Sequence, residues 1–217
     1  RRILENLRLL TDAGGTAFIR TPVIPTYNAE SEELRRIADF LDAKCAEIDV
    51  LTTDIQTQID TLEQYKRSVI TETVTKGLNP NAEMKDSGVE WIGEIPKDWE
   101  IVPLTKQLDS IVDYRGKTPE KTEEGTFLVT AKNIKDGKIC YELSKEYVRE
   151  ADYEEIMHRG IPQIGDVLFT TEAPLGQVAN VDRTDIALAQ RIIKFRALST
   201  VNNYYLKYWM LNEGFQQ

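Results

Sequence analysis

The sequence is poor in the residues from which catalytic and metal centres are usually built. It contains one histidine, His158, and two cysteines, Cys45 and Cys140, which lie far apart in the chain. Two cysteines cannot form a metal cluster alone, and as unpaired thiols they fit a reducing cytosol. A histidine-dependent triad would have to use His158, and no Gly-x-Ser-x-Gly accompanies it. We therefore expect no catalytic residue, no metal site and no cofactor in this chain.

Nucleotide-binding and methyltransferase motifs are also missing. The residues Gly116-Lys117-Thr118 resemble the end of a phosphate-binding loop, but Ile111 stands where that pattern requires a glycine. No Gly-x-Gly-x-x-Gly occurs, and neither does the Asn/Asp-Pro-Pro-aromatic run that holds a target adenine. The residues Glu83-Met84-Lys85 could be a fragment of a nuclease site. In a polar connector, however, a solvated charge cluster is the better interpretation.

Long apolar runs and a basic excess are absent too. No stretch approaches the roughly 18 apolar residues that span a bilayer, and residues 1–5 lack the apolar core of a secretory signal. We therefore expect a cytoplasmic protein with no membrane partner. The formal net charge of −9, taken alone, argues against nucleic acid. Most of the acidic excess precedes residue 96, so a locally basic face on the remaining domain could still bind phosphate.

A heptad ladder is the strongest positive feature of the sequence. Apolar residues stand at strict seven-residue intervals at Leu34, Leu41, Ile48, Ile55, Leu62 and Val69. No glycine or proline interrupts residues 31–76, which predicts one helix on the order of 65–70 Å long. Asn28 or Ser31 can cap its start, and Lys76-Gly77 with Pro80 can end it. The six ladder residues are the predicted helix-packing residues.

The second seam of this helix is less regular than the first. The residues three positions after the ladder members include Lys44 and Gln58, which are polar. A strict coiled-coil dimer would keep both seams apolar. The pattern better suits a helix packed antiparallel in a pair or a small bundle, with polar breaks that set the register. The alternative is a long helix inside an ordinary bundle.

The rest of the chain predicts an α/β protein of the α+β type, in which a coiled-coil-like spacer helix precedes a mixed-sheet domain. We assign residues 1–30 to a preceding domain remnant or an extended lead-in, 31–78 to the helix, 79–97 to a linker and 98–217 to the domain. Short apolar runs predict strands at 101–102, 111–112, 127–129, 139–141, 167–169, 178–179 and 192–195. Helices are expected at 151–158 and from residue 202 onward. The strands should be mostly antiparallel or mixed.

Polar and basic residues gather at the ends of the predicted strands. Arginine and asparagine can each make two hydrogen bonds to base edges in the major groove, and lysine and threonine can bind phosphates. For any single residue, an ordinary solvated loop is the simpler interpretation, but their grouping favours a DNA-binding surface. The predicted DNA-binding residues are Tyr114, Arg115, Lys117, Thr118, Lys132, Asn133, Lys135, Thr171 and Arg191.

Several segments, taken in order, resemble a known family. The run from Trp91 to Leu104, WIGEIPKDWEIVPL, resembles the opening of a target recognition domain in a type I restriction–modification specificity subunit. Residues 37–42, 65–70 and 74–78 resemble that family's spacer helix and its exit. Inside the domain, residues 113–119, 132–134, 165–168 and 173–176 are also similar. The resemblance covers about residues 31–217.

The resemblance implies a non-catalytic subunit for defence against foreign DNA. Such subunits carry two recognition domains, each reading half of a split target, separated by two antiparallel helices that set the gap. They dock methyltransferase subunits, which methylate adenine with S-adenosylmethionine, and the restriction subunits join them. ATP and Mg²⁺ are implied for those partners and not for this chain.

The sequence departs from the family pattern in two places. Pro22-Val23-Ile24-Pro25 is present, but Ser31-Glu32-Glu33-Leu34 replaces the usual run before the spacer helix. Only one recognition domain and one spacer helix are visible, so the chain is expected to be a fragment truncated at its C-terminal end, or a half-subunit that pairs as a homodimer through the helix. The competing functions are a protein-binding scaffold without DNA contact and a stand-alone nuclease or methyltransferase.

Overall fold

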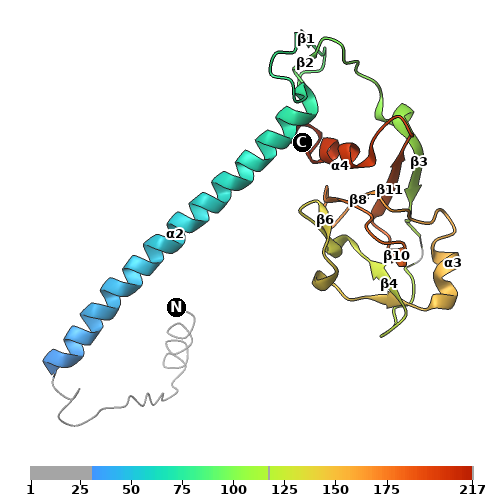
Figure 1. The fold of residues 1–217 in the computed structure, drawn as a ribbon. Coiled ribbons are helices and arrows are strands. Elements are labelled where there is room, and N and C mark those ends of the chain that lie inside the picture. The colour runs from blue at the N-terminus through green and yellow to red at the C-terminus, as the bar shows by residue number, and fades with distance from the viewer. Residues whose placement is uncertain (1–30, 117, 217) are drawn as a thin grey trace. The chain divides into compact units, whose positions relative to one another are not determined.

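The computed structural model describes residues 31–116 and 118–216 (Figure 1). The predictions for residues 1–30 and for Lys117 lie outside the described residues. The chain divides into two compact units, residues 1–60 and 61–217. This division falls within the long helix, so the C-terminal part of the helix belongs to the same unit as the globular domain. The boundaries predicted at residues 30, 78 and 97 stay predictions.

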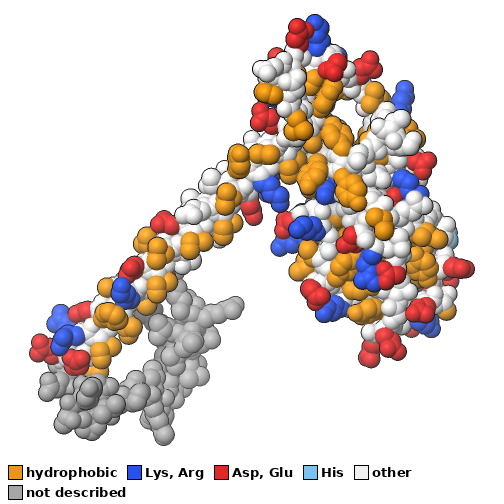
Figure 2. Space-filling view, viewed as in Figure 1, with side chains coloured by type: hydrophobic (Ala, Val, Ile, Leu, Met, Phe, Trp, Pro, Cys, Tyr) orange, Lys and Arg blue, Asp and Glu red, His pale blue; other side chains and the backbone are white. Residues whose placement is uncertain are grey.

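The long helix, α2 (Ser31–Lys76), is 46 residues long and confirms the predicted uninterrupted helix. Glu32 and Glu33 lie in its first turn and Lys76 in its last, where each charge is favoured by the helix dipole. The ladder side chains are exposed, from 41% for Val69 to 65% for Leu62. Figure 2 shows apolar side chains recurring along this helix. Within the described residues, no second helix of this chain covers the ladder, so its packing role stays a prediction.

The range 79–97 is more ordered than a simple linker. It contains an antiparallel ribbon of β1 (Met84–Asp86) and β2 (Glu94–Pro96). The ring centroid of Trp91, in the connection between these strands, lies 5.9 Å from that of Trp209. Trp91 also packs so closely on Gly214 that a Cβ there would lie 2.0 Å from the indole. The ribbon is therefore anchored to the C-terminal part of the domain, and glycine at position 214 makes room for the ring.

The globular domain contains two main sheets. The larger sheet has the order β3 (Leu108–Asp113), β11 (Ile192–Ala197), β8 (Val167–Thr170) and β9 (Val178–Asn180), and all its pairs are antiparallel. The smaller sheet has the order β10 (Ile186–Leu188), β4 (Thr126–Val129) and β7 (Tyr147–Val148), in which β10 and β4 are parallel. A separate hairpin joins β5 (Ile134–Lys135) to β6 (Lys138–Ile139). The predicted mixed sheet is confirmed.

Short helices complete the domain. Four are of the 3₁₀ type: η1 (Leu104–Gln107), η2 (Ala131–Asn133), η3 (Tyr141–Leu143) and η4 (Glu150–Asp152). Three are α-helices: α3 (Tyr153–Ile156), α4 (Asn203–Leu211) and α5 (Glu213–Gln216). The side chain of Asn202 caps α4 by accepting hydrogen bonds from the amides of Tyr204 and Tyr205. No helix among the described residues is long and apolar enough to cross a membrane.

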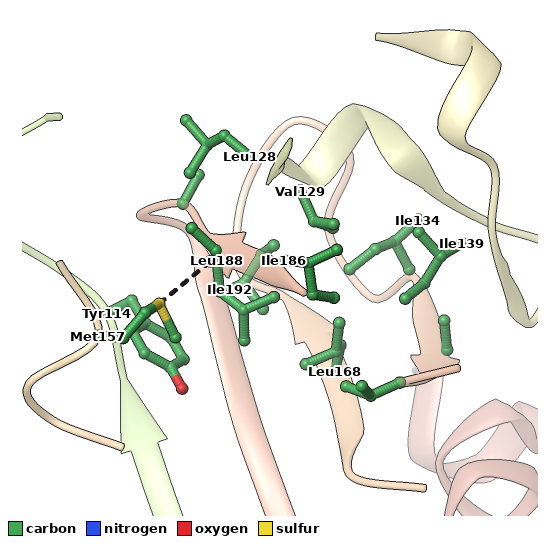
Figure 3. Close-up of a cluster of buried hydrophobic side chains, with 14 of the residues drawn as sticks. Tyr114, Leu128, Val129, Ile134, Ile139, Met157, Leu168, Ile186, Leu188 and Ile192 are labelled. Carbon is green, nitrogen blue, oxygen red and sulfur yellow. Dashed lines mark hydrogen bonds between the residues drawn. The ribbon is translucent and has the colours of Figure 1, made fainter. Parts of the chain in front are cut away.

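Side chains from the two faces of the larger sheet enter different clusters. Leu168 joins a core with Leu128, Ile186 and Leu188 of the smaller sheet (Figure 3). Its neighbour Val167 points to the opposite face and packs with Leu206 and Met210 of α4. This alternation follows from the pleat of a strand. The larger sheet therefore packs against other parts of the domain on both faces, and its strand ends and connecting loops are the candidate binding surface.

Three predictions about elements need correction. Residues 101–102 form no strand, because Pro103 removes a backbone donor and both side chains are about half exposed. The strand predicted at 139–141 covers only β6, since η3 begins at Tyr141. The helix predicted at 151–158 is shorter, with η4 leading into α3.

Candidate nucleic-acid interface

The loops predicted to bind DNA begin at one edge of the larger sheet. β3 and β8 both run antiparallel to β11, with Asp113 opposite Ile193 and Thr170 opposite Ile192. The ends of β3 and β8 therefore lie beside the start of β11. The predicted DNA-binding residues fall in four loops, at 114–118, 132–135, 171–174 and 190–191, and all but the 132–135 loop leave the sheet at this edge.

Hydrogen bonds join these three loops directly. Nε2 of Gln190 donates to Oγ1 of Thr118 at 2.9 Å, although the two residues are 72 positions apart. The amide of Thr171 donates to the carbonyl oxygen of Arg191, also at 2.9 Å. Arg191 in turn forms a 3.3 Å ion pair with Glu172. The structure thus brings Arg115, Thr118, Thr171 and Arg191 together in one surface.

The fourth predicted loop, at 132–135, lies beside this surface. The amide of Ala189 donates to the carbonyl oxygen of Val129. The residues just before β11 therefore lie beside the residues just before η2. Lys132 and Lys135 are exposed. Neither side chain forms an ion pair with any described residue, which leaves both ammonium groups available for phosphate.

Two predicted DNA contacts are buried and have structural roles in this conformation. The hydroxyl of Tyr114, 7% exposed, donates to the carbonyl oxygen of Gly160. Burial raises the pKa of this hydroxyl, so it stays protonated and remains a donor. The fully buried Asn133 accepts hydrogen bonds from the amide and hydroxyl of Thr130 and donates to two backbone carbonyls. For Tyr114 the loop sequence could not reveal this, because Gly160 is 46 positions away. For Asn133 the spacing Thr130-x-x-Asn133 of a capping box was a local signal of its structural role.

A pocket of about 430 Å³ lies beside the 114–118 loop. Its basic lining includes Arg115, Arg149 and Arg159. Nη1 of Arg159 donates to the carbonyl oxygens of Asp113 and Arg115, which fixes the course of the loop. Arg149 pairs with Glu120 and Asp152, so the pocket carries charges of both signs. Arg149 and Arg159 are not among the predicted residues, because both lie far along the chain from the 114–118 loop.

Backbone strain is concentrated in the same loops. Among the described residues, three non-glycine residues have positive φ: Asp136 at 52°, Ala173 at 44° and Arg191 at 75°. All three belong to loops that begin at or beside this edge. Such conformations cost of order 1–3 kcal/mol each and cluster at functional sites. Asp136 and Gly137 (φ 81°) form the tight turn between β5 and β6, and Asp-Gly is a favoured sequence for such a turn.

Among the described residues, no group of three or more histidine, cysteine, aspartate or glutamate residues could hold a metal ion. Arg115, Arg149 and Arg191 are already paired with partly or largely exposed carboxylates. Such pairs contribute only about 0–1 kcal/mol each. They can therefore exchange a carboxylate for a phosphate at little cost.

Comparison with known proteins confirms the predicted resemblance. The chain is 28% identical over 198 residues to the type I restriction enzyme MjaVIII specificity subunit of Methanocaldococcus jannaschii, covering 86% of this chain and 43% of that protein. It is 26% identical over 189 residues to the putative type I restriction enzyme MjaX specificity subunit of the same organism, covering 82% and 39%. The chain thus spans about two fifths of the length of these relatives. No family model matches the sequence.

Two solved structures are similar at lower identity. One is the HsdS subunit from Thermoanaerobacter tengcongensis, with 17% identity, a TM-score of 0.41, and 83% of this chain and 40% of that chain covered. The other comes from a study of complex assembly and conformational transition of the type I R-M system. It has 16% identity and a TM-score of 0.44, with 94% of this chain and 48% of that chain covered.

Proposed function

We propose that this chain provides a spacer helix and one DNA-reading domain to a type I restriction–modification specificity subunit, and that it reads half of a bipartite target. The observation that carries this proposal is the convergence of the loop residues Arg115, Thr118, Thr171 and Arg191 at one sheet edge. Thr171 is half-buried and the other three are exposed. The similarity to two specificity subunits supports the same assignment. Tyr114 and Asn133 position these loops, whereas Lys132 and Lys135 extend the contact to phosphates.

The chain itself performs no bond-making chemistry in this proposal. Methyltransferase subunits that use S-adenosylmethionine, and restriction subunits that use ATP and Mg²⁺, supply catalysis in a cytoplasmic complex. The competing function is a scaffold that binds only protein. The test that separates them is genome methylation mapping in cells with and without this chain. A bipartite adenine motif that depends on the chain supports DNA reading, and an unchanged methylome contradicts it.

DNA binding by the loop surface can be tested on the purified 217-residue chain. Replacing Arg115 and Arg191 by alanine removes two exposed guanidinium groups from the sheet edge. Arg183→Ala is the control, because Arg183 is also exposed but pairs with Asp185 away from these loops. We expect the double variant to weaken binding to duplex DNA by roughly 1–3 kcal/mol if both groups contact bases or phosphates. Equal affinities for the double variant and the control would contradict this surface.

The exposed ladder of α2 requires a partner helix in this proposal. The partner is either a second copy of this chain, packed antiparallel, or a distal helix of a longer subunit. Replacing Ile48 and Ile55 by aspartate would place charge in the seam. A control with Thr53→Asp and Gln56→Asp adds the same charge at exposed positions off the seam. We expect only the seam variant to lose mass in light scattering or helicity in circular dichroism. Unchanged mass and helicity in the seam variant would contradict helix pairing.

A further inference from the structure

A second groove lies in the unit formed by residues 61–217, next to the candidate interface. Its volume is about 570 Å³. The C-terminal part of α2 forms one wall, and the turn between β5 and β6 together with α4 forms the other. Four cations line it: Lys66 and Arg67 from α2, Lys138 from β6 and Lys207 from α4. In Figure 2, Lys and Arg side chains are visible where this part of the helix meets the domain.

These four cations differ from most others in the same unit. Among the described residues, none of the four forms an ion pair, whereas Lys76, Lys97, Lys121, Lys145 and Arg183, for example, each have a carboxylate within 4.0 Å. The chain has a net charge of −9, so carboxylates are plentiful. A cluster of unpaired cations in such a chain is a surface prepared for an anionic ligand.

The groove also contains groups that limit the kind of ligand it can bind. Glu63, Asp136 and Glu213 line it together with the four cations, so its excess positive charge is small. The ammonium of Lys207 lies 4.4 Å from the ring centroid of Tyr208, which holds it in place. A small multivalent anion would meet these carboxylates at close range. An extended polyanion, whose charges are spaced along a backbone, can contact the cations and avoid the carboxylates.

The groove is continuous with the loop surface. Gly176 and Gln177, which lie at the end of the loop that begins at Thr171, line the groove. The Gln177 side chain accepts a hydrogen bond from the amide of Asp136 at 3.4 Å and thereby joins this loop to the β5–β6 turn. Lys138 is paired in register with Lys135, one of the predicted DNA contacts. A duplex bound to the loops could therefore extend into the groove.

The cations of α2 remain accessible when the ladder is covered. Leu62 and Val69 mark the seam of the helix, and Lys66 and Arg67 fall four and five positions after Leu62. In a heptad that begins at Leu62, the position of Lys66 flanks the seam and the position of Arg67 lies opposite it. A partner helix on the ladder would leave Arg67 free, with Lys66 at the margin.

We propose that this groove binds the sugar–phosphate backbone of duplex DNA, with Lys66, Arg67, Lys138 and Lys207 neutralising phosphates. The spacer helix then takes part in DNA binding, in addition to setting the gap between the two halves of the target. This inference rests on the proposed DNA-reading function and adds a sequence-independent contact to it.

The test measures the affinity of the 217-residue chain for a mixed-sequence 30-bp duplex as salt is raised. Each phosphate contact contributes about 0.9 to the slope of log affinity against log salt. Lys66→Gln with Arg67→Gln should therefore lower the slope by roughly 1.8, and Lys138→Gln with Lys207→Gln should lower it similarly. The matched control, Lys85→Gln with Lys106→Gln, removes two cations that also form no ion pair with any described residue but lie outside the groove. It should keep the wild-type slope.

Each outcome separates the groove from the loops. If the wild-type chain binds the duplex and the groove variants keep its salt slope, the groove proposal is wrong and the proposal for the loop surface is unaffected. The groove assignment also fails if the groove variants keep their DNA affinity and lose binding to methyltransferase subunits, since the ligand is then an acidic protein surface. A wild-type chain that does not bind the duplex overturns both proposals. Far-ultraviolet circular dichroism of every variant checks that α2 remains folded.

Discussion

Nζ of Lys194 lies 3.4 Å from Oδ2 of Asp166, and the side chains are 2% and 1% exposed. Arg196 completes the cluster with two hydrogen bonds of 2.7 Å to the same carboxylate, and the amide of Gln163 donates a third. One buried carboxylate therefore satisfies two cations. It connects β11 to the 161–166 segment. Burial raises the pKa of the Tyr114 hydroxyl, and the negative charge of Asp166 raises it further.

The cluster predicts an asymmetric response to mutation. Asp166→Asn would leave Lys194 buried without a counter-charge, and losing one partner of a buried pair costs about 3–5 kcal/mol. Lys194→Met would leave Asp166 bonded to Arg196 and Gln163 and fill the space with an apolar chain. We expect that variant to be within about 1 kcal/mol of the wild type, or more stable. Urea unfolding measures both, and equal destabilisation would contradict the arrangement.

The same carboxylate predicts a loss of stability in acid. Burial by itself raises the pKa of Asp166, but the hydrogen bonds from Arg196 and Gln163 and the charges of Lys194 and Arg196 outweigh it and lower the pKa. A carboxyl whose pKa is lowered by folding contributes stability above its unfolded pKa of about 3.9, and this contribution is lost as pH falls through the folded value. The wild type should therefore exceed Asp166→Asn in stability at pH 7, with a difference that shrinks below about pH 4. A difference independent of pH would rule out the carboxylate charge as its origin.

Lys194 predicts a second increase of stability with pH, in the alkaline range. Burial lowers the pKa of its ammonium more than the nearby Asp166 raises it. The folded chain then binds fewer protons than the unfolded chain between the lowered pKa and the ordinary lysine value of about 10.4. The contribution of this group to stability should therefore increase with pH across that window. Comparing urea midpoints of the wild type and Lys194→Met from pH 7 to 10 tests this, and parallel curves would contradict it.

Asn133 and Lys132 are adjacent in sequence and should respond differently to substitution. Asn133→Ala removes the side-chain donor to the Ser144 carbonyl and one of two donors to the Cys140 carbonyl, which also accepts from the amide of Leu143. This should destabilise the domain by roughly 2–3 kcal/mol. Lys132→Ala should change stability by less than about 0.5 kcal/mol, since the side chain is exposed. DNA affinity per folded molecule should fall for Lys132→Ala only. Unchanged thermal stability in Asn133→Ala would show that its hydrogen bonds are not needed.

The amino-acid sequence by itself determined the long helix. A seven-residue apolar repeat without glycine or proline is a local pattern, and α2 has the predicted limits, Ser31 to Lys76. The same holds for strand runs such as 127–129 and 192–195, and for the Asp136-Gly137 turn, whose conformation depends on neighbouring residues. The short strand β10 was missed, because three apolar residues become a strand here only beside β4.

Only the tertiary structure decided which polar residues face solvent. Lys194 stands in the middle of an apolar run, and its inward position depends on Asp166, 28 residues earlier. Tyr114 and Asn133 looked like loop contacts, but their hydrogen-bond partners bury them. The grouping of Lys66, Lys138 and Lys207 in one groove likewise joins residues that are 72 and 69 positions apart in the sequence. The burial and charge pairing of these residues depend on contacts between distant segments, which local sequence periodicity does not specify.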